Sequence, residues 1–300
     1  MRAIVTGGAG FIGSHVVEAL LARGDEVHVV DNLATGKRGN VPEGATLHER
    51  DIREPLDELF SGIRPQACFH LAAQADVRVS VQRPDFDADV NVLGTIRVLE
   101  GARPHGTRIV FSSTGGAMYG ECERAAREDD PARPLAPYGT SKLAGEAYLA
   151  TYNRLHGTHH VTLRLGNVYG PRQDPHGEAG VVAIFLSRLR AGERPRIFGD
   201  GNQTRDYVYV GDVARATLSA LDVGAGVFNI GTGIETSVLD LSRACAEAAE
   251  VEVEPELAPA RLGELQRAFL DPALAAERLG WRPEHDLGGG LRETWRWVAA

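Results

Sequence analysis

A glycine-rich turn near the start of the chain constrains the fold more than any other feature of the sequence. The turn, Thr6-Gly7-Gly8-Ala9-Gly10-Phe11-Ile12-Gly13, follows a short apolar run at residues 3–5 and opens a stretch of helical spacing over residues 11–22. A strand, a glycine turn and a helix in this order form a dinucleotide cradle, because glycine lets the backbone approach a pyrophosphate and the helix N-terminus offers free N–H groups. The spacing is GxxGxxG rather than the commoner GxGxxG, and an isolated match is also compatible with a tight turn that binds no ligand.

The residue at the end of the second predicted strand indicates which dinucleotide is bound. Asp31 follows the apolar run at residues 27–30 and lies 18 residues after Gly13. A carboxylate at this position accepts hydrogen bonds from ribose hydroxyls and repels a 2′-phosphate, so the sequence predicts NAD rather than NADP. The alternative for Asp31 is a solvated turn residue. The predicted cofactor residues of this unit are Gly7, Gly10, Phe11, Ile12, Gly13 and Asp31.

Short apolar runs alternate with stretches of helical spacing through the first half of the chain. The runs predicted as strands are residues 3–5, 27–30, 67–71 and 108–112. Alternation of strand and helix indicates a parallel sheet that is covered on both faces. We therefore predict an α/β fold, with a Rossmann-type doubly wound parallel sheet and a smaller C-terminal substrate-binding α/β lobe.

The pattern loosens after Gly170-Pro171, where glycine- and proline-rich connections begin. We expect residues 1–170 to form the NAD-binding domain and residues 171–300 to form mainly the substrate-binding lobe. Residues of about 205–235 are expected to return to the first domain, because Val208-Tyr209-Val210 and Val227-Phe228-Asn229-Ile230 are apolar runs that could extend its sheet.

Tyr138 and Lys142, in Pro137-Tyr138-Gly139-Thr140-Ser141-Lys142, form the most informative pair of functional residues. Four residues make about one helical turn, so both side chains lie on one face of a helix. A free phenol titrates near ~10, and a neighbouring ammonium favours the phenolate and lowers the pKa. The pair can therefore transfer a proton beside a hydride carrier.

Composition and charge exclude several classes of protein. With 43% hydrophobic residues, a chain of 300 residues can bury a full core, and its net charge of −9 gives no positive field for a nucleic acid. Cys68, Cys122 and Cys245 are widely spaced, which indicates reduced thiols and no metal site. The first apolar run begins at residue 3 and no run reaches transmembrane length, so we expect a cytoplasmic protein without a membrane partner.

Motifs along the whole chain together resemble one known family. Besides the glycine turn, the motif Val30-Asp31-Asn32-Leu33 and the Tyr/Lys pair, they are His70-Leu71-Ala72-Ala73-Gln74, Asn91-Val92-Leu93-Gly94-Thr95, Ser112-Ser113-Thr114, Tyr119-Gly120, Arg164-Leu165-Gly166-Asn167-Val168-Tyr169-Gly170-Pro171, Arg205-Asp206-Tyr207-Val208 and Leu279-Gly280-Trp281-Arg282-Pro283. With this set the chain resembles the extended short-chain dehydrogenase/reductase family and, within it, the UDP-hexose 4-epimerases. The set is far more specific than any one of its members.

The resemblance implies further contacts to NAD. Asp51 and Ile52 would flank the adenine, and Asn91 would support the cofactor side. The other residues of this implied set are Asn32, Leu71, Ala72, Ala73 and Ser112, of which Leu71, Ala72 and Ala73 would line the path of the pyrophosphate and ribose. The apolar residues could instead be strand ends in the core, and Asn91 could be a polar contact that stabilises a helix.

The resemblance also implies the catalytic residues Thr114, Tyr138 and Lys142. Thr114 falls where the family places a Ser or Thr that is hydrogen-bonded to the 4-oxygen of the sugar, although it could instead cap the next turn. The related 4,6-dehydratases follow this residue with Asp-Glu, whereas here Gly115-Gly116 follow. Without a carboxylate as a second acid or base, elimination loses its catalyst and epimerisation remains.

For the nucleotide-sugar, the resemblance points to a set of polar residues in the second half of the chain. They are Asn167, Arg205, Tyr207, Arg261 and Glu264. Arginine suits a diphosphate because its planar fork forms bidentate, charge-assisted hydrogen bonds. Ala268 lies where the family has a gate for sugar size, and its small side chain would leave space for a 2-acetamido group. Its alternative is ordinary core filling.

The reaction implied by the resemblance is inversion at C4 of a UDP-hexose through a 4-keto intermediate, with NAD retained. The pair UDP-glucose and UDP-galactose is the expected substrate, and the N-acetylhexosamine pair is an additional candidate. The alternatives are another NAD-linked nucleotide-sugar enzyme, such as a uronate epimerase or a 4-ketoreductase, or a catalytically silent NAD-binding regulator. The family further implies a homodimer, here through the stretches at residues 86–101 and 142–155.

Overall fold

The computed structural model describes residues 1–176, 180–260 and 265–300, and seven strands form its central sheet. In spatial order they are β11 (Gly226–Ile230), β6 (Val161–Leu165), β5 (Arg108–Thr114), β4 (Ala67–His70), β1 (Arg2–Thr6), β2 (Glu26–Asp31) and β3 (Ala45–Glu49). Every neighbouring pair is parallel. The strand order reverses between β1 and β4, which places a ligand crevice beyond the carboxyl ends of these strands. The predicted doubly wound α/β fold is confirmed.

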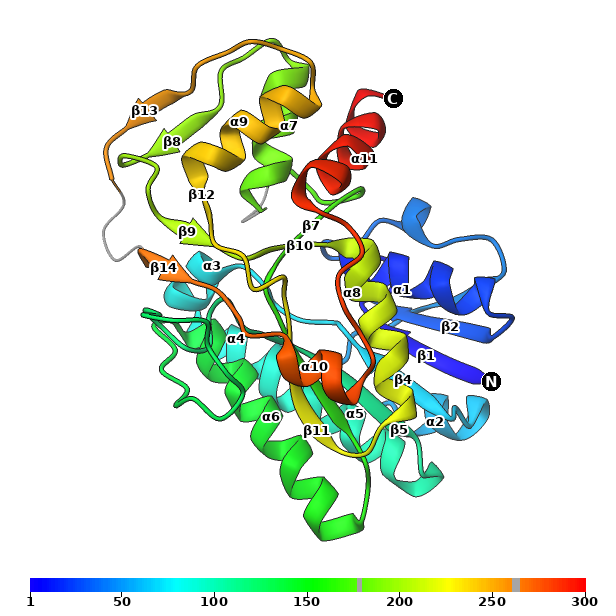
Figure 1. Cartoon of the computed structure of the whole chain (residues 1–300). Helices are drawn as coiled ribbons and strands as arrows, with labels where there is room; N and C mark the ends of the chain where they lie inside the picture. The colour runs from blue at the N-terminus through cyan, green and yellow to red at the C-terminus, as the bar shows by residue number, and fades with distance from the viewer. Residues whose placement is uncertain (177–179, 261–264) are drawn as a thin grey trace.

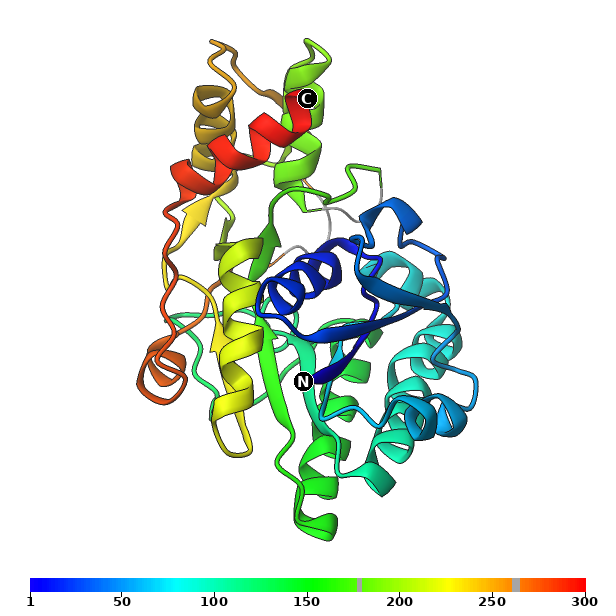
Figure 2. The same ribbon diagram turned by 90° about the vertical axis from the view of Figure 1, so that its right-hand side faces the viewer.

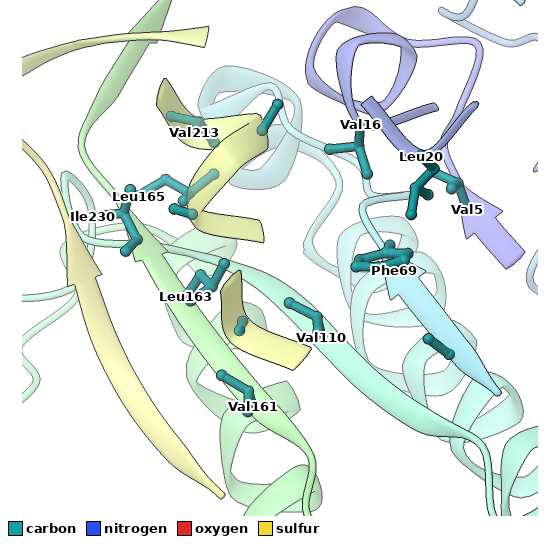
Figure 3. Close-up of a cluster of buried hydrophobic side chains, with 14 of the residues drawn as sticks. Val5, Val16, Leu20, Phe69, Val110, Val161, Leu163, Leu165, Val213 and Ile230 are labelled. Atoms are coloured by element: carbon teal, nitrogen blue, oxygen red, sulfur yellow. The ribbon is translucent and has the colours of Figure 1, made fainter. Parts of the chain in front are cut away.

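Helices cover both faces of this sheet (Figures 1 and 2). On one face lie α1 (Phe11–Ala22), α8 (Val210–Ser219) and α10 (Ala273–Arg278), and on the other lie α2 (Asp57–Ile63), α5 (Gly94–Ala102) and α6 (Pro137–His156). Side chains alternate between the two cores, because Val5 packs with α1 whereas Ile4 packs with α2 and α5. Figure 3 shows the first core, in which Val16 of α1 and Val213 of α8 lie on the sheet.

Short elements connect the sheet to the site. After β4 the chain forms α3 (Val77–Gln82), α4 (Pro84–Ala88) and a π-helical turn (Asp89–Leu93) that runs into α5. Single 3-10 turns occur at Arg38–Asn40, Arg103–His105 and Ala220–Asp222. Among the helices of the described residues, none combines the length and apolarity needed to cross a membrane.

A second, smaller core lies above the sheet in Figure 1. It is built by α7 (Val181–Arg190), α9 (Val238–Ala248) and α11 (Leu287–Ala299), which bury Phe185, Leu241 and Leu291 against one another. The accompanying short strands are β7 (Asn167–Tyr169), β8 (Arg196–Phe198), β9 (Thr204–Arg205), β10 (Tyr207–Tyr209), β12 (Thr236–Ser237), β13 (Glu256–Ala258) and β14 (Arg267–Ala268). They form one three-stranded and two two-stranded sheets.

One of the two apolar runs expected to extend the central sheet does so. The run at residues 227–230 lies in β11 beside β6, but Val208 and Tyr209 form β10, which pairs with β7 in a separate sheet. The cause lies at Gly166, whose N–H donates to the carbonyl of Ile230, while the next N–H, that of Asn167, donates to the carbonyl of Asp206 at 2.7 Å. The chain therefore changes partner strand after Gly166.

A buried ion pair joins the sheet to helix α6. The guanidinium of Arg164 in β6 lies 2.7 Å from the carboxylate of Glu146 in α6, and the two side chains are 8% and 6% exposed. Ser113 of β5 also donates to Glu146, while Arg164 donates to the hydroxyl of Tyr119 at 2.7 Å. Because several groups satisfy both charges, the pair fixes the position of α6 against β5 and β6.

Replacing Arg164 with Leu should destabilise the protein strongly, because the carboxylate of Glu146 would be left buried without its cation. We expect the free energy of unfolding to fall by about 3–5 kcal/mol in chemical denaturation. The control is Arg243→Leu, since the 3.2 Å ion pair of Arg243 with Asp240 is exposed at 64% and 63% and should contribute less than about 1 kcal/mol. Similar losses in the two variants would contradict this role of the buried pair.

Candidate active site

Three of the four glycines where β1 passes into α1 are required for different reasons. Gly7 has a φ of +71°, and a Cβ there would lie 2.6 Å from the backbone nitrogen of Ala72. A Cβ on Gly13 would lie only 2.1 Å from the carbonyl oxygen of Gly7. Gly10 is the N-cap of α1 and brings no side chain to the first turn of the helix. The turn therefore presents backbone N–H groups at the helix start, as an anion site requires.

Asp31 is fixed at the end of β2 and is 7% exposed. Its carboxylate accepts hydrogen bonds from the N–H of Ala9 at 3.0 Å and from the N–H of Leu33 at 2.8 Å. The first bond ties Asp31 to the glycine turn, and the second holds Leu33 in the left-handed region at a φ of 57°. The structure thus excludes the alternative of a solvated turn residue.

Of the two residues expected around the adenine, Asp51 belongs to a polar cluster and Ile52 is buried. Asp51 accepts from the amide of Asn32 at 2.8 Å and from the guanidinium of Arg53 at 2.7 Å, and Arg53 holds the pKa of Asp51 well below its usual range. Ile52 is 5% exposed and packs under Gly94 of α5. The structure therefore places Ile52 in the core, and the contact of Asp51 and Ile52 with adenine stays a prediction.

Sequence reasoning missed Arg53, although it follows Asp51 by two residues. Its guanidinium lies over the ring of Phe86 at 5.5 Å and also approaches Asp89 at 3.5 Å. The only sequence signal was an acid and an arginine in one short loop, which is too common to single out.

The loop after β4, which contains Leu71, Ala72 and Ala73, is half-buried beside the glycine turn. The N–H of Ala72 donates to the hydroxyl of Thr6, and Asn91 accepts from the N–H of the next polar residue, Gln74, at 2.9 Å. The amide of Asn91, 2% exposed, also donates to the hydroxyl of Ser141 in α6 at 3.1 Å. Asn91 therefore ties this loop to the helix that carries Tyr138.

A cavity of about 260 Å³ lies where the sheet meets the smaller lobe. Its lining includes seven of the predicted site residues: Phe11, Ile12, Ser112, Thr114, Tyr138, Asn167 and Tyr207. The helix N-terminus of the glycine turn and the predicted catalytic tyrosine thus open into one space. Gln173, which sequence reasoning missed, also lines this space and donates to the carbonyl of Val168 at 3.0 Å.

Tyr138 and Lys142 lie in the first two turns of α6, as their spacing predicts. Lys142 is 3% exposed, donates to the carbonyl of Ser112 at 2.9 Å and lies 4.8 Å from the centre of the Phe111 ring. Burial lowers the pKa of Lys142 to about 8. Burial, assisted by the charge of Asp87, raises the pKa of Tyr138 to about 12.

The sequence predicts that Lys142 lowers the pKa of Tyr138, whereas in the protein this pKa is raised. The ammonium donates to the carbonyl of Ser112 at the end of β5, and burial is the main cause of the raised pKa of the phenol.

Thr114 ends β5 and lines the cavity. Its hydroxyl oxygen accepts from the N–H of Ala117 at 3.2 Å, so it caps the next turn, and its own hydrogen can still be donated to a ligand. A Cβ on Gly115 would lie 2.5 Å from Leu270, and a Cβ on Gly116 would lie 3.1 Å from the side-chain oxygen of Asn167. Neither position can carry a carboxylate without movement of its neighbours.

The smaller lobe supplies the remaining predicted residues. Asn167 and Tyr207 face each other through the pairing of β7 with β10, and Ala268, which is 5% exposed, lies opposite Arg205 in the pairing of β14 with β9. Arg261 and Glu264 lie outside the described residues.

Asp206, between Arg205 and Tyr207, is a positioning residue that sequence reasoning did not single out. It is 1% exposed and accepts from the N–H and hydroxyl of Thr232 and from the N–H of Gly233. Burial raises its pKa. The signal available in the sequence was an acid within the motif Arg205-Asp206-Tyr207-Val208.

Comparison with known proteins gives consistent matches over the full chain. The profile of the family described as "NAD dependent epimerase/dehydratase" matches residues 3–231. The UDP-glucose 4-epimerase of Mycolicibacterium smegmatis is 45% identical over 304 residues, covering 98% of this chain and 97% of that protein. The structure of Thermotoga maritima UDP-glucose 4-epimerase with UDP-glucose has a TM-score of 0.97 at 46% identity, covering 99% of this chain and 98% of that one. The complex of Thermus thermophilus UDP-glucose 4-epimerase with NAD has a TM-score of 0.94 at 49% identity, covering 99% of each chain.

Replacing Gly13 with Ala should open the glycine turn, because the new Cβ would overlap the carbonyl of Gly7. We expect NAD affinity, measured by calorimetry, to fall by at least about tenfold and the free energy of unfolding to fall by about 1–3 kcal/mol. The control is Gly62→Ala in α2, where a Cβ meets no atom within 4 Å and should be neutral or stabilising by up to about 1 kcal/mol. Unchanged NAD affinity in the Gly13 variant would show that the cradle is not the cofactor site.

Proposed function

The chain belongs to the NAD-dependent epimerase/dehydratase family, and from this premise we propose that it inverts the configuration at C4 of a UDP-hexose. The observation that carries the proposal is that Thr114 and Tyr138 line the same cavity as the N-terminus of α1. A proton acceptor and a sugar-oxygen ligand thus lie beside the place where a dinucleotide fits. The full-length similarity to UDP-glucose 4-epimerases supports this activity over others in the family.

The cofactor that fits this site is NAD. The glycine turn with the N–H groups of Phe11 and Ile12 would hold the pyrophosphate, Asp31 would accept from the adenosine ribose, and Lys142 would hold the nicotinamide ribose. The close approaches at Gly7 and Gly13 show that this cradle has no room for side chains. When bound, NAD+ supplies a hydride acceptor and the positive charge that favours the phenolate of Tyr138.

In the proposed reaction, Tyr138 takes the proton from the 4-hydroxyl while C4 loses a hydride, and Thr114 holds the 4-oxygen. Lys142, with a pKa of about 8, carries its charge at neutral pH and stabilises the phenolate. The resulting 4-keto sugar would turn in the cavity, so that the hydride returns to the opposite face of C4 and Tyr138 returns the proton to the 4-oxygen. No net oxidation occurs. Because neither Gly115 nor Gly116 provides a carboxylate, no residue there catalyses elimination.

The grip on the nucleotide is proposed to come from the smaller lobe. Asn167, Arg205 and Tyr207, together with Arg261 and Glu264 outside the described residues, would bind the UDP portion. Ala268 would leave space next to the sugar, which supports N-acetylhexosamine substrates alongside glucose and galactose. A UDP-N-acetylglucosamine 4-epimerase from Methanobrevibacter ruminantium shares the fold with a TM-score of 0.94 at 31% identity.

The purified protein should convert UDP-galactose into a mixture of UDP-glucose and UDP-galactose, seen as anomeric signals in proton NMR, without added reductant. Tyr138→Phe should lower the rate by about 10²–10⁴-fold, because the phenol oxygen that moves the proton is removed. The control is Tyr148→Phe, which changes an exposed tyrosine of the same helix.

Four other outcomes would redirect the proposal. Stoichiometric consumption of added NADH would identify a 4-ketoreductase, and turnover of UDP-glucuronate alone would identify a uronate epimerase. A full rate in the Tyr138→Phe variant would contradict the catalytic role of Tyr138. No turnover of any of these sugars would favour a silent NAD-binding regulator.

We further propose that the chain acts in the cytoplasm as a homodimer. Its three cysteines are free and buried, in keeping with a reducing compartment. The helical stretches at residues 86–101 and 142–155 pack side by side and leave Leu93, Tyr148 and Leu155 exposed at 48%, 40% and 69%. Exposed apolar side chains on adjacent helices are typical of an interface.

The dimer predicts a solution mass of twice 32.2 kDa in sedimentation equilibrium. Leu93→Arg should shift the protein toward the monomer, because it places a charge in the proposed apolar contact. Leu257→Arg is the control, since Leu257 is exposed at 63% in β13 of the other lobe. A monomeric wild-type protein would contradict the proposed assembly.

A further inference from the structure

Asp87 in α4 is a buried carboxylate with an incomplete set of partners. The residue is 1% exposed, and its Oδ1 atom accepts from the side-chain amides of Gln74 at 2.9 Å and Asn91 at 3.1 Å. Its Oδ2 atom is also buried and has no hydrogen-bond partner within the described residues. Asp87 forms no ion pair in that part of the chain. A buried carboxylate without a paired cation is costly, so the structure around it has to compensate for its charge.

Two hydrogen bonds connect Asp87 to the catalytic turn of α6. The amide of Asn91, which donates to Asp87, also donates to the hydroxyl of Ser141 at 3.1 Å. Ser141 in turn donates to the carbonyl of Tyr138 at 3.0 Å, and it directly precedes Lys142. The other partner of Asp87, Gln74, belongs to the loop that lies beside the glycine turn. Asp87 therefore contacts one residue of the loop beside the glycine turn, Gln74, and one residue that is hydrogen-bonded to helix α6, Asn91.

Lys142, in the helix on which α4 packs, is a buried cation that forms no ion pair within the described residues. The groups it touches, the carbonyl of Ser112 and the ring of Phe111, carry no net charge. Glu146, one turn further along α6, is paired with Arg164. Burial lowers the pKa of Lys142, and the charge of Asp87 and, to a smaller extent, that of Glu146 act in the opposite direction.

The other titratable groups around α4 and α6 leave this balance to Asp87. His70 of β4 is neutral, because burial lowers its pKa to about 3. Two arginines of the neighbouring segments are paired in the described structure, Arg53 with Asp51 and Asp89, and Arg83 with Asp85. Arg97 of α5 has a buried Nη1 atom without a hydrogen-bond partner in the same part of the chain. Asp76 caps α3. Tyr138 faces the same carboxylate, which raises its pKa as well.

We propose that Asp87 is a positioning residue that holds Asn91 and Gln74 in place and supplies the counter-charge for Lys142. The inference rests on the proposed function only in the catalytic role given to Lys142. The charge interaction between Asp87 and Lys142 is a property of the protein and does not depend on turnover.

The composition of the chain makes this balance directly measurable. Of its 32 lysine and arginine residues, two are lysines, Lys37 and Lys142. Lys37 is exposed and lies in the loop after β2, so it serves as an internal reference. Protein labelled with ¹³C-lysine and purified with its cofactor should therefore give two side-chain signals, whose titration reports each pKa.

The test compares Asp87→Asn with the wild type in this titration. Asn keeps an oxygen that can accept from Gln74 and Asn91 but removes the charge, so the pKa of Lys142 should fall by roughly one unit while that of Lys37 stays constant. Asp85→Asn, which removes an exposed charge from the same helix, is the matched control and should shift neither signal. A pKa of Lys142 that is the same in wild type and Asp87→Asn would overturn the proposal.

A second comparison separates charge from positioning. In Asp87→Asn the alkaline limb of the pH profile of kcat/KM should move to lower pH by the same amount as the pKa of Lys142. Asp87→Ala should show this shift and also weaken NAD binding, because Asn91 and Gln74 lose their acceptor. A loss of rate without any displacement of the profile would reduce Asp87 to a structural residue.

The failure of this proposal can be told apart from failure of the proposed function. An absence of epimerisation by the wild type, together with the expected shift of Lys142, would overturn the function and leave the counter-charge standing. Turnover by the wild type without a shift in the pKa of Lys142 would overturn the counter-charge and leave the proposed function standing. Asp87→Ser, which also accepts a hydrogen bond without a charge, carries the same measurement if the Asn variant does not fold.

Discussion

The ion pair between Arg164 and Glu146 is the interaction on which the geometry of the site depends. It joins the middle of α6 to β6, while Ser113 attaches the same carboxylate to β5. Since Glu146 lies one turn beyond Lys142, fixing it also fixes where the ammonium meets the end of β5. Tyr138 and Thr114 then open into one cavity because helix and strand cannot slide past each other. The ion pair thereby fixes the positions of Lys142 and Tyr138, although it forms no hydrogen bond with either within the described residues.

Local patterns were sufficient to predict the elements around the cofactor site. The helix of α1, the strand ending in Asp31 and the shared face of Tyr138 and Lys142 each follow from spacing within a few residues. The sequence did not indicate β3 or β6 as strands. Strand β3 is an edge strand whose residues are half-exposed in an irregular pattern. Strand β6 carries Arg164, whose buried charge is balanced by Glu146, and this partner lies 18 residues earlier in the chain, outside any local pattern.

The same distinction applies within the site. Residue types and motifs predict that Gly7, Asp31 and Thr114 lie beside a ligand, and the structure places Thr114 in the lining of the cavity. They do not give the direction of a side chain or the cost of its burial. The spacing of Tyr138 and Lys142 suggested a direct effect of the ammonium on the phenol, whereas desolvation dominates both groups. The environment of Asp87 arises from the packing of α4 on α6, which no local pattern encodes.

The two-residue ladder between β9 and β14 has a consequence for how such a chain can diverge. It sets Ala268, the proposed gate for sugar size, directly opposite Arg205, a proposed ligand of the nucleotide. Paired residues of adjacent strands project to the same face of a sheet, so a bulkier side chain at the gate would crowd the side chain of Arg205. Selection for a different sugar would therefore also alter the affinity for the nucleotide, and the two traits would evolve together in this lineage rather than independently.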